Sequence, residues 1–263
     1  MILDGGSPTA INNATANELL TVGATTTELD AEANLTFDGS LLSLASSNSG
    51  DLNTFIVENT SDTSSAGARI RIKVAGSSST GDPYIDFTEA GGGQDWSMGI
   101  DVSASTFKIS KNAALGTNDV LVIDEIGAIT TPLQPAVLAT NSAVDSNVTG
   151  DGATATVDYD TEVFDQNADF ASDTFTAPVT GRYAVMAGAG FEGRTTAHTD
   201  SSVSIVASNR TIRVDTAQAA IANPSGSHIS SLIDMDAGDT LTITLRNQGE
   251  SSDVHDIRNY GEG

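Results

Sequence analysis

The chain has 263 residues, of which 38% are hydrophobic and only 5% aromatic, and its net charge is -24. The length allows one large domain or two modest ones, and the composition favours short strands with tight turns over packed helices. The acidic surface excludes nucleic acid as a partner, because such binding depends on Lys and Arg neutralising phosphates. The lack of cysteine excludes disulfides and thiolate metal sites. No stretch approaches the roughly 18 apolar residues of a membrane span.

Residues 1–50 mix short apolar pieces with acidic ones and carry little core. The opening MILDGGSPTA has neither a basic region nor an apolar run, so we expect no signal peptide. NLTFDGSLLSL (34–44) predicts a hairpin with a turn at Asp38 and Gly39. Because an isolated hairpin is marginally stable in water, we interpret 1–50 as an attachment or shaft segment that is ordered by chain association.

Residues 51–131 contain regularly spaced strand patterns and predict a β-sandwich module. In the segment 68–75 the apolar and basic side chains alternate, with Arg69, Arg71 and Lys73 on one side. That stripe favours a solvated strand face or a contact with an acidic neighbouring subunit over a contact with an anionic glycan. Trp96, the only Trp, is expected in a core or an interface. The predicted strands are 54–60, 68–75, 83–88, 95–101, 105–110, 119–124 and 127–130.

Pro132 and Pro135 indicate an extended linker over 132–140. After it, 141–263 again shows strand patterns and no strong helix. The predicted strands are 153–160, 161–165, 173–178, 181–193, 201–208, 210–221, 227–239 and 240–249. Eight strands at this spacing would fill a two-sheet jelly roll, so the whole chain is predicted to be all-β.

Two motifs in this last region resemble the complement globular-head family. The first is F-x-x-x-x-F-T-A-P-x-x-G-x-Y, and the second is the Gly-Asp pair of IDMDAGDTLTITL, at Gly238 and Asp239. The resemblance implies a tumour-necrosis-factor-like jelly roll that assembles as a homotrimer, side by side or intertwined. The chain departs from the family at its end, where DIRNYGEG replaces the usual Phe-Ser-Gly strand. The first motif comprises Phe170, Phe175, Thr176, Ala177, Pro178, Gly181 and Tyr183.

The first motif also predicts a turn between two strands. Phe175 is expected to enter the core, and Tyr183 is expected to start the next strand. Pro178 fixes φ in the turn, and Gly181 is expected to allow its tight geometry. The motif is therefore interpreted as scaffold.

The N-terminal half resembles modules of bacteriophage tail fibres and other phage appendages, in the strand patterns of 55–132 and the hairpin of 34–44. Together the two resemblances imply a trimeric virion appendage, on the tail or the capsid. Other virion proteins would hold its N-terminal region, and its head would contact a host-surface glycan or receptor. Such a protein is made in the host cytoplasm and released by lysis. A secreted, non-viral adhesin is the second interpretation.

The sequence predicts no catalytic site. His198, His228 and His255 are far apart in the chain, and none lies in a nucleophile-elbow pattern. A Ser-His-Asp site assembled in space is left open, as is a polysaccharide-degrading enzyme with two carboxylates. The latter is disfavoured because aromatic residues, which usually line glycan grooves, are scarce.

Receptor contacts are expected on loops, which vary freely on a rigid scaffold. The loops around 193–200 and 222–228 are the candidates, with Arg194, His198, Asn223 and His228 as contact residues. No cofactor is expected. Calcium is a weaker alternative, with Asp234, Asp236 and Asp239 as oxygen ligands, although turn-forming aspartates on an acidic surface are the favoured interpretation.

Overall fold

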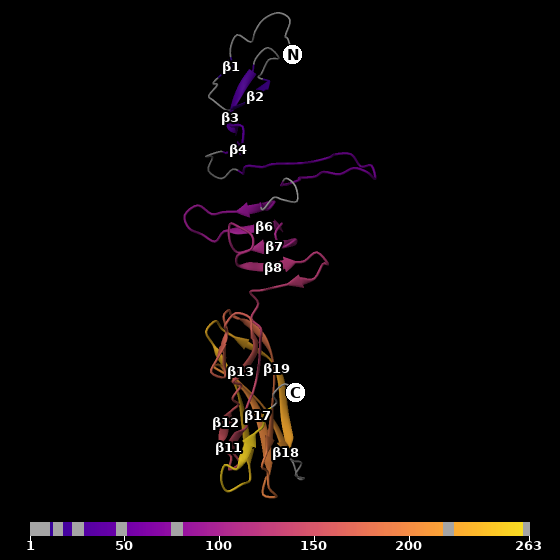
Figure 1. The fold of residues 1–263 in the computed structure, drawn as a ribbon. Helices are drawn as coiled ribbons and strands as arrows, with labels where there is room; N and C mark the ends of the chain where they lie inside the picture. Colours follow the sequence, from indigo (N-terminus) through magenta and orange to yellow (C-terminus); the bar gives the residue numbers. More distant parts are fainter. Residues whose placement is uncertain are drawn as a thin grey trace, which may run out of the picture. The chain divides into compact units, whose positions relative to one another are not determined.

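The computed structural model describes residues 11–12, 18–22, 29–45, 52–74, 81–217 and 224–259. Every regular element in these residues is a β-strand, which confirms the all-β prediction (Figure 1). The chain divides into two compact units, Met1–Arg71 and Ile72–Gly263. In the described part of the chain no helix is long and apolar enough to cross a membrane.

In the first unit, the long strand β3 (Leu29–Phe37) lies between three shorter ones. It pairs in parallel with β1 (Ile11–Asn12) and antiparallel with β2 (Glu18–Val22) and β4 (Leu42–Leu44). The predicted hairpin over 34–44 is confirmed. Asp38 Oδ1 accepts hydrogen bonds from the amides of residues 40 and 41, and Gly39 has φ +99°, which glycine adopts without strain.

The predicted strands at 54–60 and 68–75 are not formed in the described residues 52–74, which run without regular structure. The apolar side chains of Phe55, Ile56 and Ile70 are 72%, 71% and 64% exposed. The alternation at 68–74 is a true strand pattern, but a strand also needs a partner to accept its hydrogen bonds. Among the described residues of the single chain, no strand pairs with this segment.

Residues 84–130 form one five-stranded antiparallel sheet whose strands follow chain order. All five strands predicted between 83 and 130 are present. The predicted sandwich is not, because the segments needed for a second sheet form no strand in their described residues. The strands are β5 (Tyr84–Phe87), β6 (Trp96–Asp101), β7 (Thr106–Ser110), β8 (Asp119–Ile123) and β9 (Ile129–Thr130).

The C-terminal head is a jelly roll of two main sheets. The first has the order β11-β21-β16-β19, and the second has the order β14-β15-β20-β17-β18 with β12 also paired to β20. Strands adjacent in each sheet are mostly distant in sequence, as in a jelly roll. The bounds are β11 (Asp145–Thr149), β12 (Thr154–Thr156), β14 (Phe170–Ala171), β15 (Thr174–Thr176), β16 (Gly181–Glu192), β17 (Asp200–Ala207), β18 (Arg210–Ala217), β19 (Ser225–Met235), β20 (Thr240–Gln248) and β21 (His255–Ile257).

The core of the head consists of the inward side chains of both sheets. Phe191 and Ile233 come from the first sheet, Ile205 and Leu245 from the second, and all four are fully buried. Alternation along β20 is complete, with every second residue from Leu241 buried. The core therefore joins strands from 189 to 257 into one unit.

The predicted linker 132–140 is partly a strand. β10 (Val137–Thr140) pairs antiparallel with β13 (Thr161–Asp165). Gln166 holds the turn before it, because its side-chain amide donates hydrogen bonds to the carbonyls of residues 131, 132 and 134. The prolines end at 135, so nothing prevents 137–140 from donating to a ladder.

Candidate functional site

The turn between β15 and β16 carries the first motif. Tyr183 Oη donates a hydrogen bond to the carbonyl of Val179 at 2.5 Å and so closes the turn that begins at Pro178. The Tyr183 ring meets Phe175 edge-on, with centroids 5.4 Å apart, and both pack against the head core. Phe170 lies opposite Phe175 in the β14–β15 pair. The motif therefore has a scaffold role.

The second motif is bound to the first. The amide of Ala177 donates to the carbonyl of Asp239 at 2.8 Å, and the amide of Gly238 donates to the carbonyl of Ala177 at 2.8 Å. Gly238 has φ +90°, in the region that favours glycine. Gly181 has no such φ, so the prediction that this turn needs its glycine for tight geometry is wrong.

Several loops meet at one end of the head. The loop 193–199 is tied to residues 248–250, because Thr199 N donates to Gln248 O and Thr195 N donates to Glu250 Oε1. Glu250 N in turn donates to Gly150 O. β18 ends at this same end, since its last residue Ala217 pairs with Asp200. The two predicted receptor loops thus start from one end of the jelly roll.

Arg194 and His198, two of the predicted contact residues, lie inside this end. Their side chains are only 4% and 9% exposed. The guanidinium of Arg194 lies over the Phe191 ring, 4.8 Å from its centroid, where cation–π attraction offsets part of its desolvation. In the folded head these two side chains therefore face the interior, so a receptor contact through them would need the loop to open.

The buried end also brings two histidines together. The rings of His198 and His255 are 5.4 Å apart, and His255 Nε2 lies 3.4 Å from Glu250 Oε1. Burial, followed by the charge of Arg194, lowers the pKa of His198 below its usual value. The Glu250 carboxylate accepts hydrogen bonds from Thr195, and these lower its pKa. The cluster favours a neutral His198 at neutral pH.

Part of a hydrolytic arrangement is present here, since Ser201 Oγ lies 3.2 Å from His198 Nε2. A triad also needs a carboxylate on the other ring nitrogen. Within the described residues, His198 Nδ1 has no hydrogen-bond partner. Ser201 is fully buried and so is not open to a substrate. The pair fits a structural hydrogen bond, and the absence of catalysis stays a prediction.

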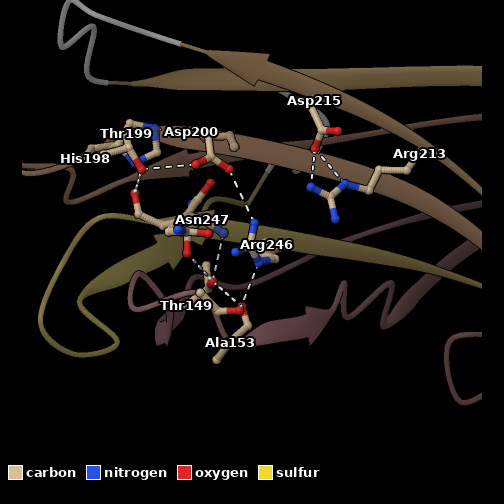
Figure 2. A network of polar contacts seen from close by, with 12 residues as sticks. Thr149, Ala153, His198, Thr199, Asp200, Arg213, Asp215, Arg246 and Asn247 are labelled. Carbon is tan, nitrogen blue, oxygen red and sulfur yellow. Dashed lines mark hydrogen bonds and ion pairs between the residues drawn. The ribbon is translucent and has the colours of Figure 1, made fainter.

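Beside the histidines, a polar network clamps the second sheet to the turn after β11 (Figure 2). Asp200 joins Arg246 through an ion pair of 3.3 Å, and Arg246 Nε donates to the carbonyl of Gly152 at 3.0 Å. Thr149 Oγ1 donates to Ala153 O at 2.6 Å and accepts from the Asn247 amide at 2.9 Å. The network rigidifies the base on which the exposed loop residues stand.

The other predicted site residues are scattered. Asn223 lies outside the described residues. His228 is exposed on β19 rather than in a loop, and its ring lies over Gly188, where an added Cβ would come 2.3 Å from Nδ1. The predicted strand 227–239 already contained His228, and the predicted loop 222–228 overlapped it; β19 begins at Ser225, so the strand prediction holds and the loop placement of His228 is wrong.

The weak calcium candidates each have protein partners. Asp234 forms an ion pair with Arg210 at 2.8 Å, and Asp239 accepts a hydrogen bond from the amide of Asp236. Across the described ranges no three His, Asp or Glu side chains are grouped closely enough to hold a metal ion. Calcium binding stays an untested alternative.

An open apolar cavity of about 1090 Å³ lies within the head. It is lined by β10 and β13 on one side and by strands of the main sheets on the other, including Leu138, Phe164, Tyr183 and Val185. The lining comes from segments far apart in the chain, which is why no sequence pattern indicated it.

The fold and the scaffold role of its motifs define the class: an all-β chain with a C-terminal jelly-roll head. No protein-family model matches the chain, and no curated protein does. Solved structures similar to it include the globular domain of zebrafish complement 1qA protein, at 13% identity and a TM-score of 0.32 over 47% of this chain and 92% of that one. Murine APRIL is similar at 12% identity and a TM-score of 0.29, over 48% of this chain and 96% of that one.

Proposed function

We propose that the protein is a trimeric fibre or surface appendage of a tailed-phage virion, without catalytic activity. The observation that carries the proposal is the uneven burial of apolar residues. In the head, core residues such as Phe191 and Ile205 are fully buried, while Leu52, Phe55 and Ile56, earlier in the chain, are 90%, 72% and 71% exposed. Monomeric proteins rarely leave such residues grouped in water, and symmetric association is the usual way to cover them.

The assignment to a virion rests on the resemblance of the N-terminal half to phage appendage modules and of the head motifs to a trimer-forming family. In this proposal the N-terminal region binds another virion protein. The loops at the clamped end of the head contact a host-surface glycan or receptor. Their exposed residues include Thr196 and Ser251, while the buried network beneath them supplies the rigidity that precise contacts need.

The mass of the protein in solution tests the trimer. Sedimentation equilibrium at micromolar concentration is expected to give three times the chain mass of 26.9 kDa. A monomer at all concentrations would refute the proposed assembly.

Labelling of intact particles tests the virion role. Antibody against the head is expected to mark the tail or the capsid surface in electron micrographs, and the purified protein is expected to compete with particles for host cells. Particles that carry no label would remove the virion assignment whatever the mass in solution.

A further inference from the structure

We propose that one face of the β5–β9 sheet is the surface through which copies of this chain pack against each other, like face on like face. The inference rests on the self-association proposed above and assigns it a surface. This apolar face is formed by Ile85, Phe87, Trp96, Met98, Ile100, Phe107, Ile109, Leu121, Ile123 and Ile129.

The register places these side chains together. In an antiparallel sheet, residues directly opposite one another point to the same side, as do every second residue along each strand. Met98 is opposite Ile85 on β5 and Ile109 on β7, and Ile109 is opposite Leu121 on β8. The face thus spans all five strands, and every one of its ten side chains is apolar.

The other side of the sheet is already covered by its own chain. Lys108 is buried there between two carboxylates, 2.8 Å from Asp101 Oδ2 and 2.9 Å from Asp119 Oδ2. The β7–β8 loop lies against this pair, because a Cβ added at Gly116 would come 3.5 Å from Asp101 Oδ2. Ser110 on this side is fully buried. Over β6–β8 the sheet therefore has one largely closed polar side and one open apolar side.

The open side is too large to be left in water. Seven of its side chains, those of Ile85, Phe87, Trp96, Met98, Ile100, Phe107 and Ile129, are between 37% and 64% exposed in the single chain. At about 150–250 Å² for a large side chain, they leave roughly 600 Å² of apolar surface. That is at the upper limit for the largest patch of a monomer and approaches the roughly 800 Å² per partner of a stable interface.

A second copy is the occupant that we propose, because the face has nearly the area of a stable interface and charge does not oppose contact there. A chain with a net charge of -24 repels itself over most of its surface. The apolar face carries no charge, so here two or three copies can meet without opposing carboxylates. Apolar contact is also non-directional, so two copies of the face need no matching of charges or hydrogen bonds. A different virion protein as the occupant is an outcome of the test.

The single tryptophan makes the test direct, because Trp96 lies on the face and its fluorescence reports how well the face is covered. Acrylamide quenching of the full chain is measured together with its mass. In the oligomer, quenching is expected to be about fivefold weaker than for a free tryptophan amide, because interface cores exclude water. An oligomer in which Trp96 is quenched as readily as a 39%-exposed side chain overturns the inference and leaves the trimer standing.

The variant Met98→Glu places a carboxylate in the centre of the face. It is expected to weaken self-association at least about tenfold and to restore Trp96 quenching, since an unpaired charge in an interface core is strongly disfavoured. The matched control Ala104→Glu adds the same charge at an exposed turn of the same sheet and is expected to assemble as the wild type does. Circular dichroism shows whether Met98→Glu is folded, and if it is not, the wild-type quenching decides.

The outcomes separate the two proposals. A wild-type dimer with shielded Trp96 supports the face and refutes the trimer. A monomer at every concentration overturns both, including the case in which only another protein covers the face. Equal assembly of Met98→Glu and wild type overturns the face alone.

Discussion

The head and the β5–β9 sheet differ in the kinds of residue that they bury. In the head, Phe191 and Ile205 are fully buried between two sheets, and buried polar residues such as Ser201 and His255 lie in the same domain as this apolar core. In the central sheet, the buried polar or charged residues are Ser97, Asp101, Lys108 and Ser110, while Phe107 and Met98 remain exposed. Apolar and polar residues alternate clearly along the strands of both regions, so alternation by itself does not tell which side of a strand is buried.

This difference in burial shows that the single central sheet covers only one of its faces with its own loops. The head has a second sheet to cover its apolar side. The central sheet covers its polar side with a loop and an ion triad, an arrangement whose desolvation is costly unless every charge is paired. Its apolar side is left exposed in the single chain.

The largest expected effect compares two phenylalanines. Phe191→Ala is expected to destabilise the head by about 3–5 kcal/mol, because it leaves a cavity in a closed core. Phe107→Ala should cost much less in a dissociated chain, where Phe107 is 37% exposed, and nearly as much as Phe191→Ala in the assembled protein. Hydrogen exchange, read separately for each region, measures both. Equal small losses for Phe107→Ala in both states would contradict a covered face.

Removal of the buried cation tests the polar side. Lys108→Met is expected to cost the central sheet about 3 kcal/mol, because it leaves Asp101 and Asp119 buried without their counter-charge. The exposed Lys73→Met is the matched control and should change stability by less than about 0.5 kcal/mol. The same loss in both variants would show that the triad is not buried in solution.

Acid should destabilise the head at a higher pH than the central sheet. Because burial lowers the folded pKa of His198, the unfolded chain takes up a proton first, so the head loses stability as pH falls below about 6.5. In the sheet, the hydrogen bond from Lys108 lowers the pKa of Asp101 to about 2, so its contribution is lost only between about pH 4 and that value.

Region-resolved hydrogen exchange from pH 7 to pH 3 checks this order. His198→Gln is expected to reduce the early loss in the head and to leave the sheet unchanged. A sheet that opens before the head on acidification would contradict the assignment.

The smallest expected effect is at the motif turn. Tyr183→Phe removes the hydrogen bond to the carbonyl of Val179 and is expected to cost the head about 0.5–1.5 kcal/mol. Tyr84→Phe, at a partly exposed tyrosine of β5, serves as the control in the other region. Chemical denaturation, monitored by hydrogen exchange in each region, measures both stabilities. A loss of stability in the central sheet on Tyr183→Phe would contradict independent unfolding of the two regions.

Local pattern predicted most strands well. The hairpin turn at Asp38 and Gly39, the five strands of the central sheet and the long strands of the head are confirmed near their predicted bounds. The short strands β1, β2, β10, β11, β14 and β21 were missed, because two to five residues offer too few alternations to stand out. Because of the prolines at 132 and 135, the predicted linker was also extended too far, so that it included β10.

The candidate site was less predictable. Arg194 and His198 were placed on the right loop by their position after β16, but a loop of polar residues is expected at the surface. Their burial depends on Phe191, Ser201 and His255, which come from three different strands. No spacing within the loop indicates such partners.

The sequence by itself determined that this chain is all-β and where most of its strands and turns lie. Those features depend on period-two alternation and on the φ preferences of a few turn residues, both of which are local. Only the tertiary structure decided which face of each strand is covered. It buried Lys108 between two aspartates, enclosed His198, and left 52–74 without a partner strand, because coverage depends on segments that meet only after the chain has folded.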